Sequence, residues 1–171
     1  MAKAVFGIAK TEEQAVHIIN RLKEAGFSNN DVSVLLPDRA ATRDFAHEQH
    51  TKAPEGAAAG AVAGGVMAGV LGWLVGIGSL AIPGVGPLIA AGPIMAALSG
   101  VAAGGAVGGI TGALVGFGIP EYEAKQYEGK LKTGNILISV HTEDSKARAV
   151  AKEILEREHA SDISYTGGAR V

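Results

Sequence analysis

Cysteine is absent from this chain of 171 residues. The chain therefore has no disulfides, no thiolate metal ligands and no cysteine nucleophile, and its composition suits a reducing compartment. Aromatic residues make up only 5% of the chain, and acidic and basic side chains nearly balance to a net charge of −2. Proteins that bind nucleic acid usually carry a basic patch with interleaved aromatic residues. We therefore expect no nucleic-acid partner.

Charge is missing altogether from one long segment. Residues 56–120 contain no Lys, Arg, Asp, Glu or His and hold 19 of the 25 glycines. All 15 basic and all 17 acidic side chains lie outside this segment. We interpret residues 56–120 as an insertion of membrane-like composition within an otherwise ordinary soluble sequence.

Small residues recur at every fourth position in two runs of this segment. On an α-helix such positions share one face, where another backbone can come very close, as in tightly packed membrane helices. Between the runs, the sequence Ile82-Pro83-Gly84-Val85-Gly86-Pro87 must end one helix and turn the chain. The pattern predicts a glycine-zipper hairpin of two helices. Its predicted helix-packing interface is Gly56, Gly60, Gly64, Ala68, Gly72, Gly76, Gly92, Ala96, Gly100, Gly104, Gly108, Gly112 and Gly116.

The residues before the segment predict a strand, a helix and a second strand. Residues 4–8 and 31–36 are the predicted strands. Between them, Thr11 begins a capping box in which its hydroxyl accepts a backbone N–H while Gln14 reaches back. Apolar residues follow at helical spacing, and Gly26 is expected to end the helix.

The residues after the segment predict a helix, a strand, a helix and a strand. Pro120 suits the first turn of the first helix, and residues 135–141 form the strongest strand pattern in the chain. Thr142 or Asp144 caps the next helix, and residues 162–165 are the last predicted strand.

Together the two halves predict an α+β fold. We expect a ferredoxin-like β-α-β…α-β-α-β domain, with a four-stranded antiparallel sheet and helices on one face, interrupted by a long Gly/Ala-rich two-helix hairpin. The predicted division is a discontinuous ferredoxin-like domain (1–37 and 121–171), a polar linker (38–55) and the glycine-zipper hairpin (56–120).

Candidate catalytic and ligand-binding patterns are weak. His47 and His50 have suitable spacing for a metal, but a metal site needs three or four converging ligands. The glycine pairs lack the lysine of a phosphate-binding loop, and no Ser, His and carboxylate arrangement can be argued. We expect no enzyme, no metal, no cofactor and no small-molecule substrate.

Three stretches carry a resemblance to a known family. AVFGIAKTEEQAVHIINRLKEAGFSNNDVSVL resembles the opening of the bacterial general stress protein domain, also called the heat-induced stress protein domain. AIPGVGPLIAAGP and GFGIPEYEAKQYEGKLKTGNILISVHTED are similar to longer members of that family that carry a glycine-zipper hairpin. The resemblance implies a stress-associated, non-enzymatic protein.

Three functions follow as alternatives. In the first, the protein self-assembles through a hairpin inserted in or attached to the cytoplasmic membrane, with the α+β domain in the cytosol. Each arm has roughly 25 apolar residues, enough to cross a bilayer. In the second, the hairpins form the buried core of a soluble particle, tube or filament. Both predict a homo-oligomer. In the third, the chain is an accessory subunit of a membrane oxidoreductase complex, although it has no haem, iron–sulfur or flavin motif.

Overall fold

The computed structural model describes residues 3–37, 73–74, 78–82, 86–94, 98 and 109–166. Within these residues the protein has an α+β fold. The strands are β1 (Ala4–Ala9), β2 (Val32–Pro37), β3 (Gly78–Ile82), β4 (Gly86–Ala91), β5 (Ile136–His141) and β6 (Ser161–Tyr165). The helices are α1 (Glu12–Glu24), α6 (Gly109–Gly116), α7 (Glu121–Lys132) and α8 (Ser145–Arg157). The predicted linker (38–55), including His47 and His50, lies outside the described residues.

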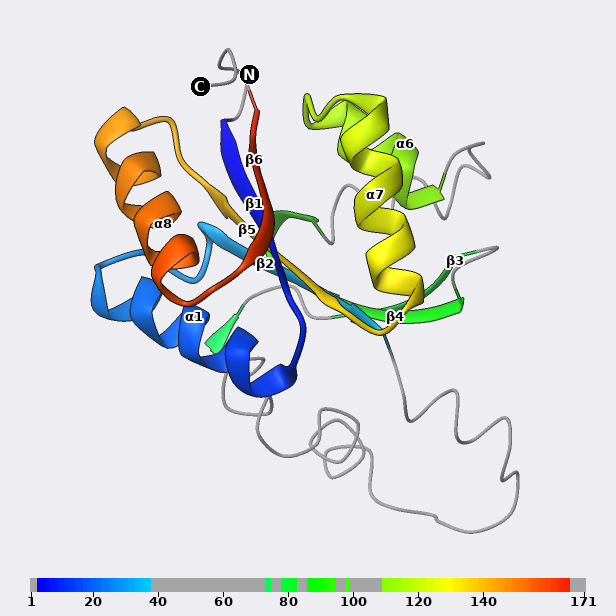
Figure 1. Cartoon of the computed structure of the whole chain (residues 1–171), viewed down its shortest axis with the longest axis horizontal. Coiled ribbons are helices and arrows are strands. Elements are labelled where there is room, and N and C mark those ends of the chain that lie inside the picture. Colours follow the sequence, from blue (N-terminus) through cyan, green and yellow to red (C-terminus); the bar gives the residue numbers. More distant parts are fainter. Residues whose placement is uncertain are drawn as a thin grey trace, which may run out of the picture.

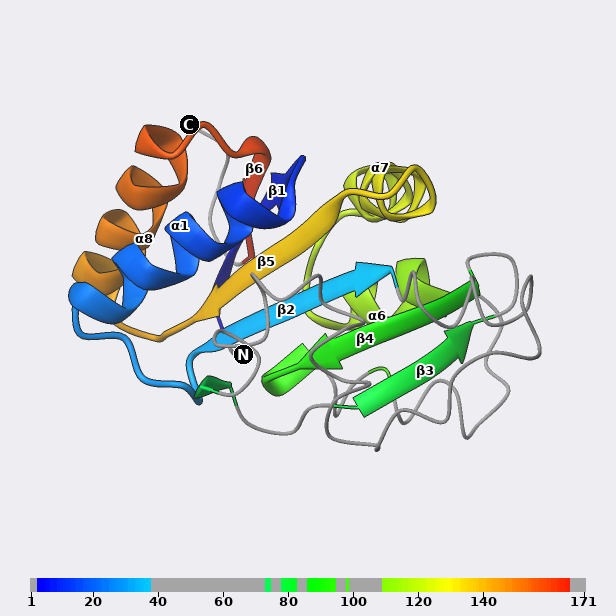
Figure 2. The same cartoon turned by 90° about the horizontal axis from the view of Figure 1, so that it is seen from below.

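The strands form one six-stranded sheet in the order β3-β4-β2-β5-β1-β6 (Figure 2). Every neighbouring pair is antiparallel. Helices α1 and α8 cover one face of the sheet, and α6 and α7 cover the other (Figure 1). The expectation of helices on one face only was therefore wrong. The central strands explain the second layer, because all six residues of β1 are buried and a sheet that is apolar on both faces must be covered on both.

The middle of the charge-free segment forms strands, so the predicted helical hairpin was wrong for residues 78–82 and 86–91. The predicted turn does reverse the chain, but it joins β3 to β4, and β4 pairs with β2 from Val34↔Ala91 to Pro37↔Leu88. Glycine costs about 1 kcal/mol relative to alanine inside a helix, whereas pairing with β2 gives these residues a hydrogen-bonded ladder. The far end of the second arm is helical as predicted, in α6.

The helix ends predicted at Thr11, Gly26 and Asp144 are confirmed, whereas the reciprocal bond of the predicted capping box is not. Thr11 Oγ1 accepts a hydrogen bond from the backbone N–H of Gln14 at 3.1 Å and begins α1. Gln14 Oε1 accepts from the N–H of Lys10 at 2.8 Å, one residue earlier than a capping box requires. Gly26 follows the helix with φ +95°, and Asp144 caps α8 by accepting from Lys146 N at 2.9 Å. These contacts fix where the helices begin and end.

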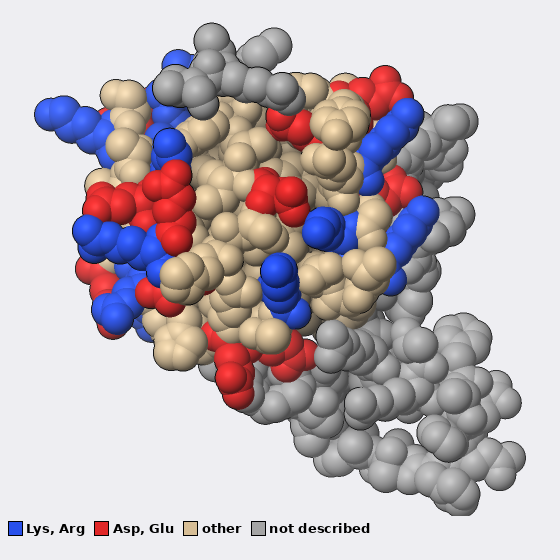
Figure 3. All heavy atoms as spheres, viewed as in Figure 1, with Lys and Arg blue, Asp and Glu red and all other residues tan. Residues whose placement is uncertain are grey.

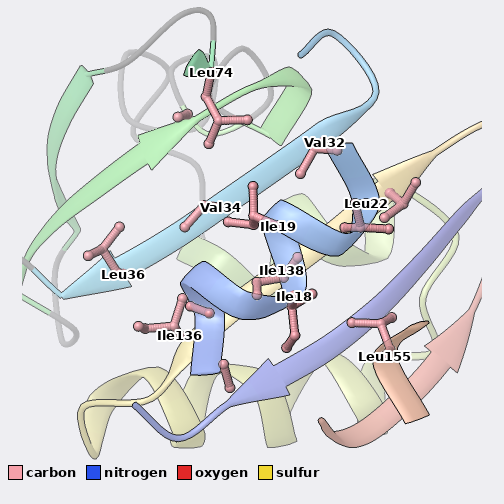
Figure 4. Close-up of a cluster of buried hydrophobic side chains, with 14 of the residues drawn as sticks. Ile18, Ile19, Leu22, Val32, Val34, Leu36, Leu74, Ile136, Ile138 and Leu155 are labelled. Atoms are coloured by element: carbon pink, nitrogen blue, oxygen red, sulfur yellow. The ribbon is translucent and has the colours of Figure 1, made fainter. Parts of the chain in front are cut away.

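The two faces of the sheet carry two hydrophobic cores, and the charge-free segment contributes to both. Figure 4 shows the core beneath α1 and α8, where Leu74 lies among side chains of α1 and β2. Trp73 packs against the same core, with Lys23 Nζ 5.5 Å from its ring centroid. In the core beneath α6 and α7, the large residues from the segment are Leu88, Ile94, Leu98, Ile110, Leu114 and Ile119. The described part of residues 56–120 is thus built into the α+β fold.

Candidate functional site

Gly92 is one predicted interface residue whose environment is described. It follows β4 with φ +85°, and a Cβ added there would lie 2.2 Å from the carbonyl oxygen of Val32 and 2.8 Å from Ser33 Cα. A side chain at this position would therefore collide with the backbone of β2. Two backbones do come close at Gly92, but the partner is a strand and Gly92 lies outside any helix, so this contact is not the predicted helix packing.

Helix α6 holds two further predicted interface residues, Gly112 and Gly116. Both are exposed, and a Cβ at Gly116 would meet nothing within 4 Å. The buried side of α6 consists instead of Ile110, Ala113 and Leu114, which belong to the core shared with α7. The glycine stripe therefore does not form the contact between these two helices. The remaining predicted interface residues, which lie outside the described residues, are Gly56, Gly60, Gly64, Ala68, Gly72, Gly76, Ala96, Gly100, Gly104 and Gly108.

A carboxylate of α7 ties α6 in place. Glu128 Oε2 accepts hydrogen bonds from the backbone N–H of Thr111, at 3.3 Å, and from its hydroxyl. Lys132 Nζ lies 3.3 Å from the other oxygen. Burial opposes ionisation here, but the hydrogen bonds from Thr111 and the ammonium of Lys132 lower the pKa of Glu128 below its usual value. The charged carboxylate therefore satisfies one N–H group, that of Thr111, in the first turn of α6.

A buried polar cluster lies beneath this helical layer. Ser33 and Ser139 are directly opposite each other on β2 and β5. The two residues are 0% and 1% exposed. His141 Nε2 lies 3.1 Å from Ser33 Oγ and 2.8 Å from Ser139 Oγ. The backbone N–H of Ile94 donates to Ser33 Oγ at 3.1 Å. The cluster thus joins two central strands to the residues that follow β4.

Aromatic rings surround the imidazole of this cluster. The centroid of the His141 ring lies 6.0 Å from that of Phe6, edge to face, and 5.3 Å from that of Phe117. Burial lowers the pKa of His141 to about 4, against a smaller opposing effect of the Asp31 charge. The ring is therefore neutral at neutral pH.

The cluster has a serine hydroxyl next to an imidazole, as a nucleophilic site does, but its serines are not accessible to a substrate. A catalytic serine needs an adjacent base and a face open to substrate. Ser33 and Ser139 are both buried and share one ring nitrogen. Among the described residues, no hydrogen bond reaches the other ring nitrogen, and no group of three or more His, Cys, Asp or Glu could hold a metal. The arrangement suits a structural clasp.

This cluster was not predicted from the sequence. Ser33 and Ser139 interrupt strongly apolar strands at positions where the alternation calls for buried side chains, which was the available signal. Their pairing depends on the register of β2 against β5, which no local pattern specifies.

A second buried polar group anchors α7 to the edge strand β6. The hydroxyl of Tyr127 donates to the carbonyl oxygen of Asp162, and Ser164 Oγ lies 2.6 Å from the same hydroxyl. Since the Tyr127 proton is engaged by the carbonyl, Ser164 is the donor in the second bond. Burial raises the pKa of Tyr127 above its ordinary value. Lys130 Nζ adds an ion pair with Asp162 at 3.8 Å.

We expect Tyr127→Phe to lower the free energy of unfolding by about 2 kcal/mol, because Asp162 O and the Ser164 hydroxyl would lose a buried partner. Tyr122→Phe is the matched control on the same helix, since Tyr122 is 69% exposed and should change stability by less than about 0.5 kcal/mol. Urea unfolding of both variants measures the difference. Equal, small effects would show that the Tyr127 hydroxyl does not anchor β6.

On the face seen in Figure 3, acidic and basic side chains gather mainly over the helices at the two sides, and the area between them is mostly uncharged. Neither sign dominates this face. Within the described ranges, no helix is both long enough and apolar enough to cross a bilayer.

Comparison of the chain with models of protein families, with curated proteins and with solved structures found no match.

Proposed function

We propose that this protein is non-enzymatic and acts by associating with copies of itself through the charge-free segment. The observation that carries this proposal is the composition of α6, which is apolar on both sides. Ile110 and Leu114 are buried, whereas Val115 is 42% exposed beside Gly112 and Gly116. A helix without a polar face is normally covered on all sides. A second copy of the chain is the proposed cover, and an association with stress rests on the family resemblance alone.

The fold proposed for the soluble part is ferredoxin-like. Its support is the order β2-β5-β1-β6 within the sheet, with all neighbours antiparallel. Helices α1 and α8 each connect two strands that are separated by one strand of the sheet, β1 to β2 and β5 to β6. Two such split β-α-β units define the ferredoxin-like arrangement. The hairpin β3–β4 then extends that sheet beyond β2.

The second candidate partner is a lipid bilayer in the cytoplasmic membrane. The observation in its favour is the absence of charge from residues 56–120. A membrane-inserted hairpin of two long helices that meet at residues 82–87 does not agree with strands β3 and β4, which flank that turn. Any lipid contact would therefore involve other parts of the segment, and we favour the soluble assembly.

Light scattering coupled to size exclusion, with chemical cross-linking, tests the proposal on the purified full chain. We expect a homo-oligomer in detergent-free buffer. Val115→Glu should weaken it by at least about tenfold in dissociation constant, because a carboxylate would be buried in an apolar contact. Val150→Glu on α8 is the matched control, since Val150 is 41% exposed and lies outside the charge-free segment.

Two outcomes would contradict the proposal. A protein that is monomeric at every concentration would contradict self-association. Equal weakening of the oligomer by Val115→Glu and Val150→Glu would show that α6 is not part of the contact. Sedimentation with vesicles of phosphatidylcholine and phosphatidylglycerol decides between the two partners. Binding to vesicles by a chain that stays monomeric in buffer would favour the lipid alternative.

A further inference from the structure

The residues after β4 cover the buried Ser33–Ser139–His141 cluster. A Cβ at Gly92 would lie 2.9 Å from Ser33 Oγ, so the backbone of this turn rests directly on that hydroxyl. Ile94, which is 0% exposed, donates its N–H to the same oxygen at 3.1 Å. Gly92 to Ile94 therefore separate Ser33 from solvent on this side.

The hydrogen bonds of the cluster depend on a neutral imidazole. Ser33 Oγ accepts from Ile94, so its own proton must find an acceptor, and His141 Nε2 is 3.1 Å away. The Ser139 hydroxyl is 2.8 Å from the same nitrogen. In the neutral tautomer that carries its proton on Nδ1, Nε2 presents one lone pair, which the two hydroxyls share as acceptor. A protonated Nε2 is itself a donor, so both hydroxyls lose this acceptor and must reorient.

We propose that His141 is an acid-sensitive latch: protonation of its ring releases Gly92 to Ile94 from β2 while the central strands stay paired. The release admits water to both buried hydroxyls and leaves the half-buried ring of His141 more exposed. The central strands are the stronger attachment, because β5 is paired with β1 along its whole length and with β2 on its other side. Among the described residues, the backbone N–H of Ile94 is held by one hydrogen bond, to the Ser33 side chain, and the buried Ile94 side chain adds apolar contact in the core beneath α6 and α7.

The charges around His141 determine the pH at which the latch opens. On β1 and β5 the ring faces Phe6 and Ser139, and on its other side it faces Phe117, none of which carries charge. Asp31, next to β2, is the charged group that acts on the ring, and it favours the protonated form. Burial outweighs that charge and lowers the pKa of His141 from 6.5 to about 4.

The sign of the effect follows from these two values. In the released state the ring is solvated and takes up a proton near pH 6.5, whereas in the closed state it does so only near pH 4. The closed state therefore has its full stability above pH 6.5 and loses it as the pH falls from 6.5 toward about 4.

If the proposed self-association uses the residues that follow β4, the latch would regulate it. The latch itself does not require self-association.

Amide hydrogen exchange measured by NMR tests the latch in the full chain. Between about pH 7.5 and about pH 4, we expect the protection factor of the Ile94 amide, corrected for intrinsic exchange rates, to fall by about 100-fold. Amides of the β1–β5 ladder, such as those of Val5 and Val140, should keep their protection. His141→Phe should abolish the pH dependence at Ile94, and His17→Gln, at an exposed position of α1, should retain it.

Each other outcome counts against the latch. A parallel loss of protection at Ile94 and in the β1–β5 ladder would indicate global unfolding, and constant protection at Ile94 would show that the turn does not open. If His141→Phe does not fold, the comparison of Ile94 with the ladder in the unmodified chain still decides. Light scattering at about pH 7.5 tests self-association separately, so a monomer there would contradict the proposed function and leave the latch standing.

Discussion

Gly92→Ala should destabilise the protein by about 3 to 5 kcal/mol, more than Gly26→Ala or Gly116→Ala. Two effects add at this position. The backbone has φ +85°, a conformation that L-residues with a Cβ adopt at a cost of about 1 kcal/mol or more. The new Cβ would also lie 2.2 Å from the Val32 carbonyl oxygen, so the turn would have to lift away from β2.

Gly26→Ala separates the two effects. Gly26 has φ +95° but nothing within 4 Å of the added Cβ, so only the conformational cost of about 1 kcal/mol remains. Gly116→Ala, in open space at the end of α6 and at ordinary φ, should be neutral or slightly stabilising. Denaturant unfolding of the three variants gives the comparison. If Gly92→Ala costs no more than Gly26→Ala, the turn after β4 is not seated on β2.

Deleting residues 38–119 should abolish cooperative unfolding of the remaining chain, contrary to the separable hairpin that the composition suggests. The deletion removes Leu88, Ile94, Leu98, Ile110, Leu114 and Ile119 from the core beneath α6 and α7. Each buried side chain of this kind contributes roughly 2 kcal/mol, so the loss is on the order of 10 kcal/mol, comparable to the whole stability of a typical domain. Helix α7 would be left over a half-empty face of the sheet.

A chain that joins Pro37 to Pro120 through a short Gly/Ser linker provides the measurement. Calorimetry and near-ultraviolet circular dichroism should show no cooperative transition and no fixed tertiary packing. A soluble, cooperatively folding product would instead show that residues 1–37 and 120–171 form a core of their own.

Neighbouring residues of α6 give a milder test of the same point. Leu114 is 0% exposed and Val115 is 42% exposed. Leu114→Ala should cost about 2 to 5 kcal/mol through the cavity that it leaves, whereas Val115→Ala should cost less than about 1 kcal/mol in the monomer. Similar values for the two variants would mean that α6 is not packed on the core.

The regular glycine spacing of the predicted interface did not identify the packing partners of these glycines. At Gly92 only a residue without a Cβ fits against Val32, but this contact is with a strand and not with the predicted helix. The same spacing implied a helix partner, and at Gly112 and Gly116 the described structure places glycine on an exposed side. The spacing of glycines shows where the chain lacks side chains, but it does not show which helix or strand packs there.

The sequence by itself determined the elements whose signals are local. Thr11, Gly26 and Asp144 mark helix ends through hydrogen bonds and φ values within a few residues, and the apolar strands beside them were recognised from composition. These signals are short-range, so they act in the same way whatever the rest of the chain does. The α+β class of the fold follows from them.

Only the tertiary structure decided the role of residues 78–91 and the pairing of Ser33 with Ser139. A run of Gly, Ala and branched apolar residues without charge is compatible with a helix or a strand, because both bury apolar side chains. Strand β2 had one side free beyond β5, and pairing there satisfies the backbone of β4 and places Ile94 against Ser33. That choice depends on contacts between residues 61 positions apart, which lie beyond the reach of any local pattern.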